Sequence, residues 1–165
     1  MSYAIIGFGK IGQALAKAFA RNGIEVSAAT TRDPETFASD AAAIGPTIIP
    51  KKLAEAVKAD IVFLAVRYES HRDVAKAFTG AKFVKGFNHV IAATLAADPI
   101  VEGGHRVIFL SSDDEDATAP VAALAKQLGF APVKLGKLNE GGALVHARGR
   151  TWGQLIFQDL FKKEQ

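Results

Sequence analysis

The sequence predicts an α/β fold: a doubly wound, mainly parallel sheet with helices on both faces, giving three layers (αβα). Two observations predict it. Apolar runs of strand length alternate with segments of helical periodicity along nearly the whole chain, and a glycine-rich turn joins the first strand to the first helix. With 165 residues the chain is expected to form a single domain, residues 1–165, around one core.

The first three elements are a strand, a helix and a second strand. Residues 3–7 form a short apolar run, and from residue 11 to residue 19 apolar side chains recur with the helical period. Asn22-Gly23 is a favourable helix stop, and residues 24–29 form the second apolar run. The chain therefore opens as a βαβ unit.

The remaining elements continue this alternation. Residues 60–66 are apolar on both faces, which predicts a central parallel strand. Pro34 suits the first turn of a helix. The expected helices are 34–42, 51–58, 70–78, 91–97, 114–128 and 152–161, and the expected strands are 47–49, 60–66, 82–87, 107–110 and 132–135.

The turn after the first strand carries a dinucleotide-binding pattern. Gly7, Gly9 and Gly12 have the spacing G-x-G-x-x-G between a strand and a helix. The first glycine permits a tight turn, the second lets the backbone approach a pyrophosphate, and the third lets the helix pack closely on the sheet. Amides at the helix N-terminus attract the anion. The sequence therefore predicts a Rossmann-like fold that binds a dinucleotide, with a purely structural glycine turn as the alternative.

The end of the second strand indicates which dinucleotide. Sites for NAD usually carry an acid there, whereas this chain has Thr30, Thr31 and Arg32. Two hydroxyls and a guanidinium suit the 2′-phosphate of NADP(H), which an acid would repel. One alternative is that Thr31 caps the next helix and Arg32 is a solvated charge. Another is that Asp33 is the acid, although its place beside Pro34 favours an N-cap role. NADP(H) is the expected cofactor.

With these residues in place, the chain resembles the family of NADP oxidoreductases that use the deazaflavin coenzyme F420. The resemblance covers nearly the whole chain and rests on residues 7–12, 30–32, 62–66, 84–88 (V-K-G-F-N), 112–114 (S-D-D) and 135–138 (L-G-K-L). It implies a Rossmann-fold enzyme, commonly dimeric, that moves hydride between NADP(H) and a deazaflavin or flavin-like acceptor.

The resemblance also implies roles for single residues. The three glycines would hold the pyrophosphate, and Thr31 and Arg32 would hold the 2′-phosphate. Val66 and its neighbours would border the cofactor, and Asn88 would lie near the nicotinamide and the acceptor. The full set of expected cofactor contacts is Gly7, Phe8, Gly9, Lys10, Ile11, Gly12, Thr30, Thr31, Arg32, Ala65, Val66, Arg67 and Asn88.

Two departures from the family pattern concern the acceptor side. The family commonly has proline followed by an aromatic residue where this chain has Arg67-Tyr68. It also usually has an extra strand and a long loop where only residues 79–81 separate the predicted helix 70–78 from the strand 82–87. The identity of the acceptor therefore stays open. Besides an NADPH-dependent oxidoreductase, a non-catalytic NADP(H)-binding sensor or regulatory module is the alternative function.

Hydride transfer between two rings needs positioning rather than a side-chain nucleophile. The candidate catalytic residues are Asn88 and His89, because ligands of such sheets bind outside the carboxyl ends of strands. His89 could protonate the reduced acceptor, and the alternative is a loop imidazole bonded to a backbone carbonyl. Phe8 and Tyr68 could stack on a planar ring or simply pack.

Composition argues against several other functions. Cysteine is absent, which excludes disulfides, thiolate zinc sites and cysteine nucleophiles, and the histidine spacing indicates no metal site. A net charge of +3 is too small for a nucleic-acid-binding stripe, so no nucleic acid partner is expected. No apolar run approaches the ~18 residues of a membrane span. We expect a cytoplasmic protein whose partner is a small-molecule redox acceptor.

The last predicted helix has an unusually wide apolar stripe for a helix that covers one face of a small sheet. It therefore predicts a homodimer through the C-terminal helix. The stripe consists of Trp152, Leu155, Ile156, Phe157, Leu160 and Phe161.

Overall fold

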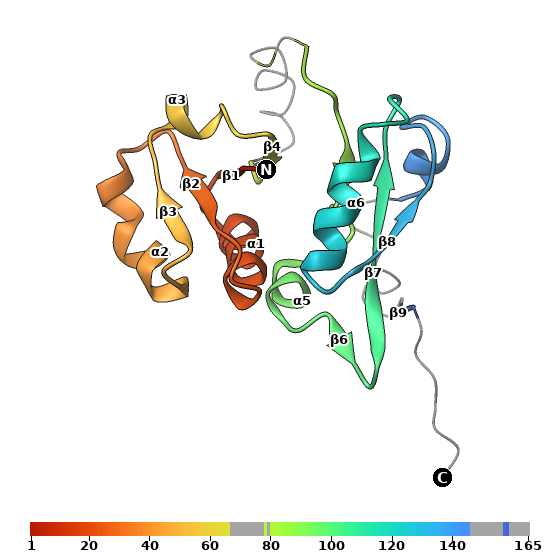
Figure 1. The fold of residues 1–165 in the computed structure, drawn as a ribbon, viewed down its shortest axis with the longest axis horizontal. Coiled ribbons are helices and arrows are strands. Elements are labelled where there is room, and N and C mark those ends of the chain that lie inside the picture. Colours follow the sequence, from red (N-terminus) through yellow and green to blue (C-terminus); the bar gives the residue numbers. More distant parts are fainter. Residues whose placement is uncertain (67–77, 79, 146–156, 159–165) are drawn as a thin grey trace. The chain divides into compact units, whose positions relative to one another are not determined.

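The structure is a computed structural model that describes residues 1–66, 78, 80–145 and 157–158. The chain divides into two compact units, Met1–Ala81 and Lys82–Gln165. Figure 1 labels their helices and strands. That the whole chain forms one domain stays a prediction.

The first unit contains a four-stranded parallel sheet with the strand order β3-β2-β1-β4. Its elements are β1 (Tyr3–Ile6), α1 (Lys10–Arg21), β2 (Val26–Ala29), the 3₁₀ helix η1 (Pro34–Phe37), α2 (Ala38–Ile44), β3 (Ile48–Pro50), α3 (Leu53–Ala56) and β4 (Ile61–Leu64). Parallel strands joined by helical crossovers confirm the predicted Rossmann-like α/β fold.

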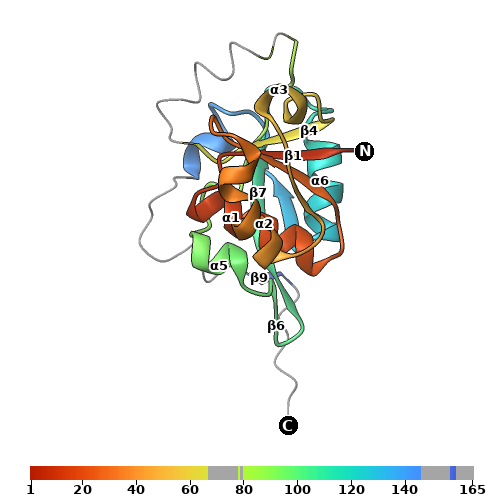
Figure 2. The same cartoon turned by 90° about the vertical axis from the view of Figure 1, so that its left-hand side faces the viewer.

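Alternate residues of β1 face opposite helical layers. Ala4 and Ile6 pack with Ala56 of α3 in one cluster. Ile5 points the other way, toward the start of α1, where its Cγ2 lies 3.4 Å from a Cβ built on Gly12. Figure 2 shows α3 on one side of β1, with α1 and α2 on the other. The period-2 alternation of a strand thus produces three layers in this unit.

The position of β4 corrects one prediction. Its residues are apolar on both faces, which indicated a central strand, but β4 lies at the end of the four-strand order and its four side chains are only half-buried. The inner strands are β1 and β2. An apolar run shows that both faces are partly covered, but it does not show whether each edge is paired.

The second unit is organised around one long strand, β7. Its elements are β5 (Lys85–Gly86), α5 (Ala92–Ala96), β6 (Ile100–Val101), β7 (Gly104–Ser111), α6 (Thr118–Gln127), β8 (Ala131–Lys134), the 3₁₀ helix η2 (Gly141–Leu144) and β9 (Phe157–Gln158). β8 pairs with β7 in parallel, whereas β5, β6 and β9 pair with it antiparallel.

Three features of this unit differ from the predictions. The expected strand 82–87 is reduced to β5 and is antiparallel to β7, so the alternation of elements gave the wrong strand direction here. A hairpin joins β6 to β7 through Glu102 (φ 50°) and Gly103 (φ 81°). Phe157 and Gln158 form a strand rather than part of a helix, because their backbones pair with β7. The rest of the predicted helices 70–78 and 152–161 lies outside the described residues, apart from Phe78, which is in a bend.

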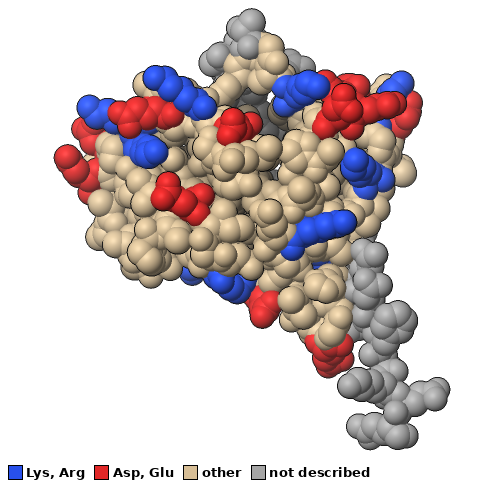
Figure 3. All heavy atoms as spheres, in the orientation of Figure 1, with Lys and Arg blue, Asp and Glu red and all other residues tan. Residues whose placement is uncertain are grey.

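Basic and acidic side chains are mixed on the face of each unit drawn in Figure 3, and the described residues form no continuous basic stripe on that face. Among the described helices, none has the length and apolar character needed to cross a bilayer. The expected absence of a nucleic acid partner stays a prediction.

Candidate functional site

The carboxyl ends of the parallel strands in the first unit are tied together by backbone hydrogen bonds. The amide of Gly7 donates to the carbonyl of Ala29 after β2 (2.8 Å), and that of Ala65 donates to Ile6 (2.8 Å). The amide of Lys51 donates to Ala28 (2.8 Å). Segments that follow all four strands therefore meet at one edge of the sheet, which is where ligands bind in open α/β sheets.

Only glycine fits at the first position of the glycine motif. Gly7 has a φ of 99°, and a Cβ there would lie 2.6 Å from the carbonyl oxygen of Ala65 and 3.1 Å from Cγ1 of Val66. The turn can therefore lie directly against the segment after β4. This contact places Ala65 and Val66, two of the expected cofactor contacts, beside the glycine loop.

The other two glycines have opposite surroundings. A Cβ on Gly12 would collide with the carbonyl oxygen of Gly7, whereas a Cβ on Gly9 would meet nothing within 4 Å. Gly9 is the N-cap of α1, and Lys10 and Ile11 are exposed in its first turn. Open space beside the free amides of an N-terminus of a 12-residue helix fits a bound pyrophosphate. Binding by these residues stays a prediction.

The ring of Phe8 packs inside the first unit. Only 6% of Phe8 is exposed, and its ring centroid lies 5.2 Å from that of Phe37 in η1. This is the packing alternative for Phe8 rather than stacking on a planar ligand. Because the ring is packed in this way, Phe8 would contact a dinucleotide through its backbone.

A pocket of about 400 Å³ lies at the end of β2. Its lining consists of Thr30, Thr31, Arg32, Asp33, Pro34, Lys52 and Leu53. The Thr30 hydroxyl accepts a hydrogen bond from the Arg32 amide (3.0 Å) and donates one to the Arg32 carbonyl (3.3 Å). This local hydroxyl-to-backbone turn shapes the loop and brings all three predicted 2′-phosphate contacts to one pocket.

The charges of this pocket are two cations and one carboxylate. Arg32 and Lys52 are exposed, and neither has an ion-pair partner within the described part of the chain. Asp33 is the N-cap of η1 by position, but its side chain makes no capping hydrogen bond. Lys52 was missed by the sequence reasoning. The signal that could have found it is its position two residues after the end of β3, the parallel neighbour of β2.

In the second unit, the segment around β5 holds the η2 turn in place. The Lys85 ammonium donates to the carbonyls of Gly142 (2.6 Å) and Val145 (2.9 Å), and the Asn88 amide nitrogen donates to Val145 (3.4 Å). Asn88 Oδ1 is buried without a hydrogen-bond partner among the described residues. Phe87, which lies between Lys85 and Asn88 in the sequence, has a φ of 59°, a backbone conformation that residues other than glycine rarely adopt. Lys85 was not among the predicted site residues.

His89 has the arrangement of the non-catalytic alternative. The residue is 7% exposed, Nε2 lies 3.2 Å from the carbonyl oxygen of Val107, and the ring centroid lies 5.0 Å from that of Phe109. Burial lowers the pKa of His89 below its ordinary value of 6.5, and the bond to the carbonyl opposes this shift only in part. A neutral imidazole at neutral pH is a poor proton donor, so a catalytic role for His89 stays a prediction.

The lowered pKa of His89 predicts a pH-dependent stability. Below about pH 6.5 the unfolded chain binds a proton at this residue more readily than the folded chain, so stability falls as the pH decreases. His89→Gln keeps a nitrogen donor for the Val107 carbonyl but removes the titration. We expect the free energy of unfolding to fall less between about pH 7 and about pH 5 in this variant than in the wild type. The free energy of unfolding is measured by urea unfolding at each pH. If it decreased by the same amount with pH in His89→Gln and in the wild type, the assignment to His89 would be contradicted.

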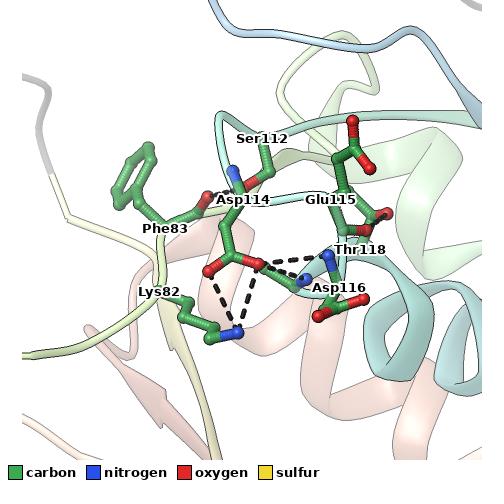
Figure 4. A network of polar contacts seen from close by, with 8 residues as sticks. Lys82, Phe83, Ser112, Asp114, Glu115, Asp116 and Thr118 are labelled. Atoms are coloured by element: carbon green, nitrogen blue, oxygen red, sulfur yellow. Dashed lines mark hydrogen bonds and ion pairs between the residues drawn. The ribbon is translucent and has the colours of Figure 1, made fainter.

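The acidic run before α6 forms a hydrogen-bond network in the turn that precedes this helix (Figure 4). Asp114 Oδ1 accepts hydrogen bonds from the amides of Asp116 (3.1 Å) and Ala117 (3.2 Å) and from the Lys82 ammonium (3.1 Å). The Ser112 hydroxyl donates to the Phe83 carbonyl (2.6 Å). The bond from Lys82 lowers the pKa of Asp114. The predicted helix 114–128 therefore begins later, at Thr118, since the acid shapes the turn before it.

The comparisons with known proteins agree with this geometry. Residues 2–86 match the family described as NADP oxidoreductase, coenzyme F420-dependent. A solved structure of a hypothetical protein from Sinorhizobium meliloti is 33% identical, with 92% of each chain covered and a TM-score of 0.79. The chain belongs to this family. By family and fold it is an NAD(P)-dependent oxidoreductase, as its resemblance to F420-dependent NADP oxidoreductases implied.

More distant structures share the fold of this family. A candidate F420-dependent NADP reductase from an Arthrobacter species is 24% identical, with 88% of this chain and 90% of that chain covered and a TM-score of 0.68. An imine reductase from Myxococcus stipitatus in complex with NADP⁺ is 16% identical, with 87% and 57% covered and a TM-score of 0.63. A comparison with curated proteins gives no match.

Two of the predicted contact residues follow shortly after β4 in the sequence of this family member. Arg67 and Tyr68 lie outside the described residues, so their expected contacts with the cofactor or acceptor stay predictions. Within the described ranges, no group of three or more His, Asp or Glu side chains is arranged to hold a metal ion.

Proposed function

We propose that this chain is an NADPH-dependent reductase that transfers hydride to a planar acceptor of the deazaflavin or flavin class. The observation that carries the cofactor preference is the pocket at the end of β2. It combines the hydroxyls of Thr30 and Thr31 with the guanidinium of Arg32 directly after the strand, and its one carboxylate, Asp33, follows these three residues. Membership of a family described by NADP and coenzyme F420 supports both the cofactor and the class of acceptor.

The chain's own residues would hold the cofactor along one edge of the sheet. Backbone amides of the glycine loop and the first turn of α1 would bind the pyrophosphate, because Gly9 leaves that turn uncovered. Thr30, Thr31 and Arg32 would bind the 2′-phosphate, and Ala65 and Val66 would border the cofactor beside Gly7.

When bound, NADPH supplies the hydride, and the protein supplies binding and orientation. Such a transfer does not require a side-chain acid, and His89, the candidate acid, is buried and has a lowered pKa. Asn88 and His89 stay our candidates on the acceptor side.

A homodimer, proposed from the C-terminal segment, would be recognised by sedimentation; a purely monomeric species would contradict it.

Reductase activity is tested by following NADPH absorbance under anaerobic conditions with coenzyme F420, FMN and FAD as separate acceptors. We expect oxidation of NADPH with at least one of them and much slower oxidation of NADH. Tight binding of NADPH without turnover on any of the three would contradict the reductase and favour the alternative, a non-catalytic NADP(H)-binding module. A no-enzyme control with each acceptor corrects for direct reduction.

A further inference from the structure

We propose that Lys52 is a specificity-determining residue, a second cation that selects NADP(H) over NAD(H) by binding the 2′-phosphate opposite Arg32. This inference rests on the proposed function, because it assumes that the pocket at the end of β2 receives that phosphate. Arg32 and Lys52 are separated by 20 positions in the sequence, yet both line the same pocket.

The parallel pairing of β2 and β3 brings these two residues together. Val26, Ser27 and Ala28 lie opposite Ile48, Ile49 and Pro50, so both strands end at the same edge of the sheet. The Lys51 amide extends the pairing by one more bond, to the Ala28 carbonyl (2.8 Å). The segments that leave the two strands therefore start side by side, one carrying Arg32 and the other Lys52.

Lys52 is held at this edge from both sides. Its predecessor is fixed by the backbone bond to β2, and its successor, Leu53, packs against the buried cluster that contains Ala4 and Ile6. The Lys52 carbonyl accepts hydrogen bonds from the amides of Glu55 (3.0 Å) and Ala56 (3.1 Å). Hydrogen bonds and packing thus fix the backbone of Lys52, whereas its ammonium has no ion-pair partner within the described residues.

The charges of the pocket favour a dianion once both cations are counted. Arg32 presents a planar fork and Lys52 a compact charge, which are complementary ways to hold a phosphate. Asp33 is the one carboxylate among the seven lining residues and opposes them. Without Lys52, the charges of Arg32 and Asp33 would cancel. The preference for a 2′-phosphate therefore depends on the lysine as well as on the arginine.

The test compares 2′,5′-ADP with 5′-ADP as ligands, so that only the 2′-phosphate distinguishes them. We expect Lys52→Ala to weaken the binding of 2′,5′-ADP and of NADPH about fivefold. This loss of affinity is near the upper end of what an exposed ion pair contributes, because the partner of the lysine is a dianion. Binding of 5′-ADP and NADH should not change. Lys52→Arg should keep most of the preference for 2′,5′-ADP over 5′-ADP. Raising the salt concentration should weaken the binding of 2′,5′-ADP more in the wild type than in Lys52→Ala.

The matched control is Lys51→Ala, which removes the adjacent lysine side chain but keeps the backbone bond to Ala28 and does not touch the pocket lining. It should bind all four ligands as the wild type does. An equal loss in Lys51→Ala and Lys52→Ala would contradict a specific contact.

The two proposals fail in different ways. A wild type that binds 2′,5′-ADP no better than 5′-ADP would contradict the NADP(H) preference itself. A wild type that prefers 2′,5′-ADP through Arg32, with the full preference retained in Lys52→Ala, would contradict only the role of Lys52. Thermal unfolding of each variant verifies that it is folded.

Discussion

Gly12→Ala is expected to lower the free energy of unfolding by at least about 2 kcal/mol and to abolish dinucleotide binding. The added Cβ would collide with the carbonyl oxygen of Gly7, whereas its 3.4 Å distance to Cγ2 of Ile5 is an ordinary contact. Alanine is favoured over glycine inside a helix by only about 1 kcal/mol. The collision involves backbone, which cannot rotate away, so it outweighs this gain and displaces the glycine loop. Urea unfolding measures the first effect and calorimetric titration with NADPH the second.

Gly9→Ala is the matched control for this prediction. Gly9 has an ordinary φ of −83°, and its Cβ would meet no atom of the protein within 4 Å. We expect a stability loss of no more than about 1 kcal/mol, from a poorer N-cap, together with weaker binding of NADPH. Equal stability of Gly12→Ala and the wild type would show that the loop and α1 do not pack as described. Unchanged NADPH binding by Gly9→Ala would place the pyrophosphate elsewhere.

Arg32→Ala is expected to weaken NADPH binding by about 1.5 to 3 kcal/mol, the value of a hydrogen bond to a charged group, with a much smaller effect on NADH. The physical reason is that, in the proposed complex, only NADPH would present a phosphate at the end of β2. Arg32 has no ion pair to lose within the described residues, so the substitution should hardly change stability. Titration calorimetry with both nucleotides measures the difference.

Arg32→Lys refines this test because it keeps the charge and removes the fork. We expect an intermediate loss of NADPH affinity. Losses of equal size for NADPH and NADH in Arg32→Ala would mean that Arg32 does not contact the 2′-phosphate, and Arg32 would then be the solvated surface charge of the alternative interpretation.

The sequence was most informative where local chemistry determines the structure. The order of β1, α1 and β2, the helix end at Asn22 and the positive φ of Gly23 (64°) all follow from short patterns. The tight turn at Gly7 and the close packing at Gly12 follow from the same glycine motif. Such features depend on neighbouring residues and therefore need no knowledge of the tertiary fold.

The errors arose where pairing between distant segments decides the structure. Nothing within residues 82–87 reveals that β5 runs antiparallel to β7, and an apolar stripe around Phe157 does not separate a helix from a strand that pairs with Arg106. Glu102-Gly103 was a missed local signal, since an acidic residue followed by glycine resembles a favoured two-residue hairpin turn. Lys52 escaped notice because β3 is short and its neighbour along the sheet is distant in sequence.

The central claim is that the amides at the start of α1 and the cations beyond β2 and β3, Arg32 and Lys52, bind NADP(H) in preference to NAD(H). Calorimetric titration of the wild-type chain with NADPH and NADH, at matched moderate salt, tests it most directly. We predict measurable binding of both, with NADPH at least about tenfold tighter. Absence of heat and of thermal stabilisation with both nucleotides, or equal affinity for the two, would contradict the account.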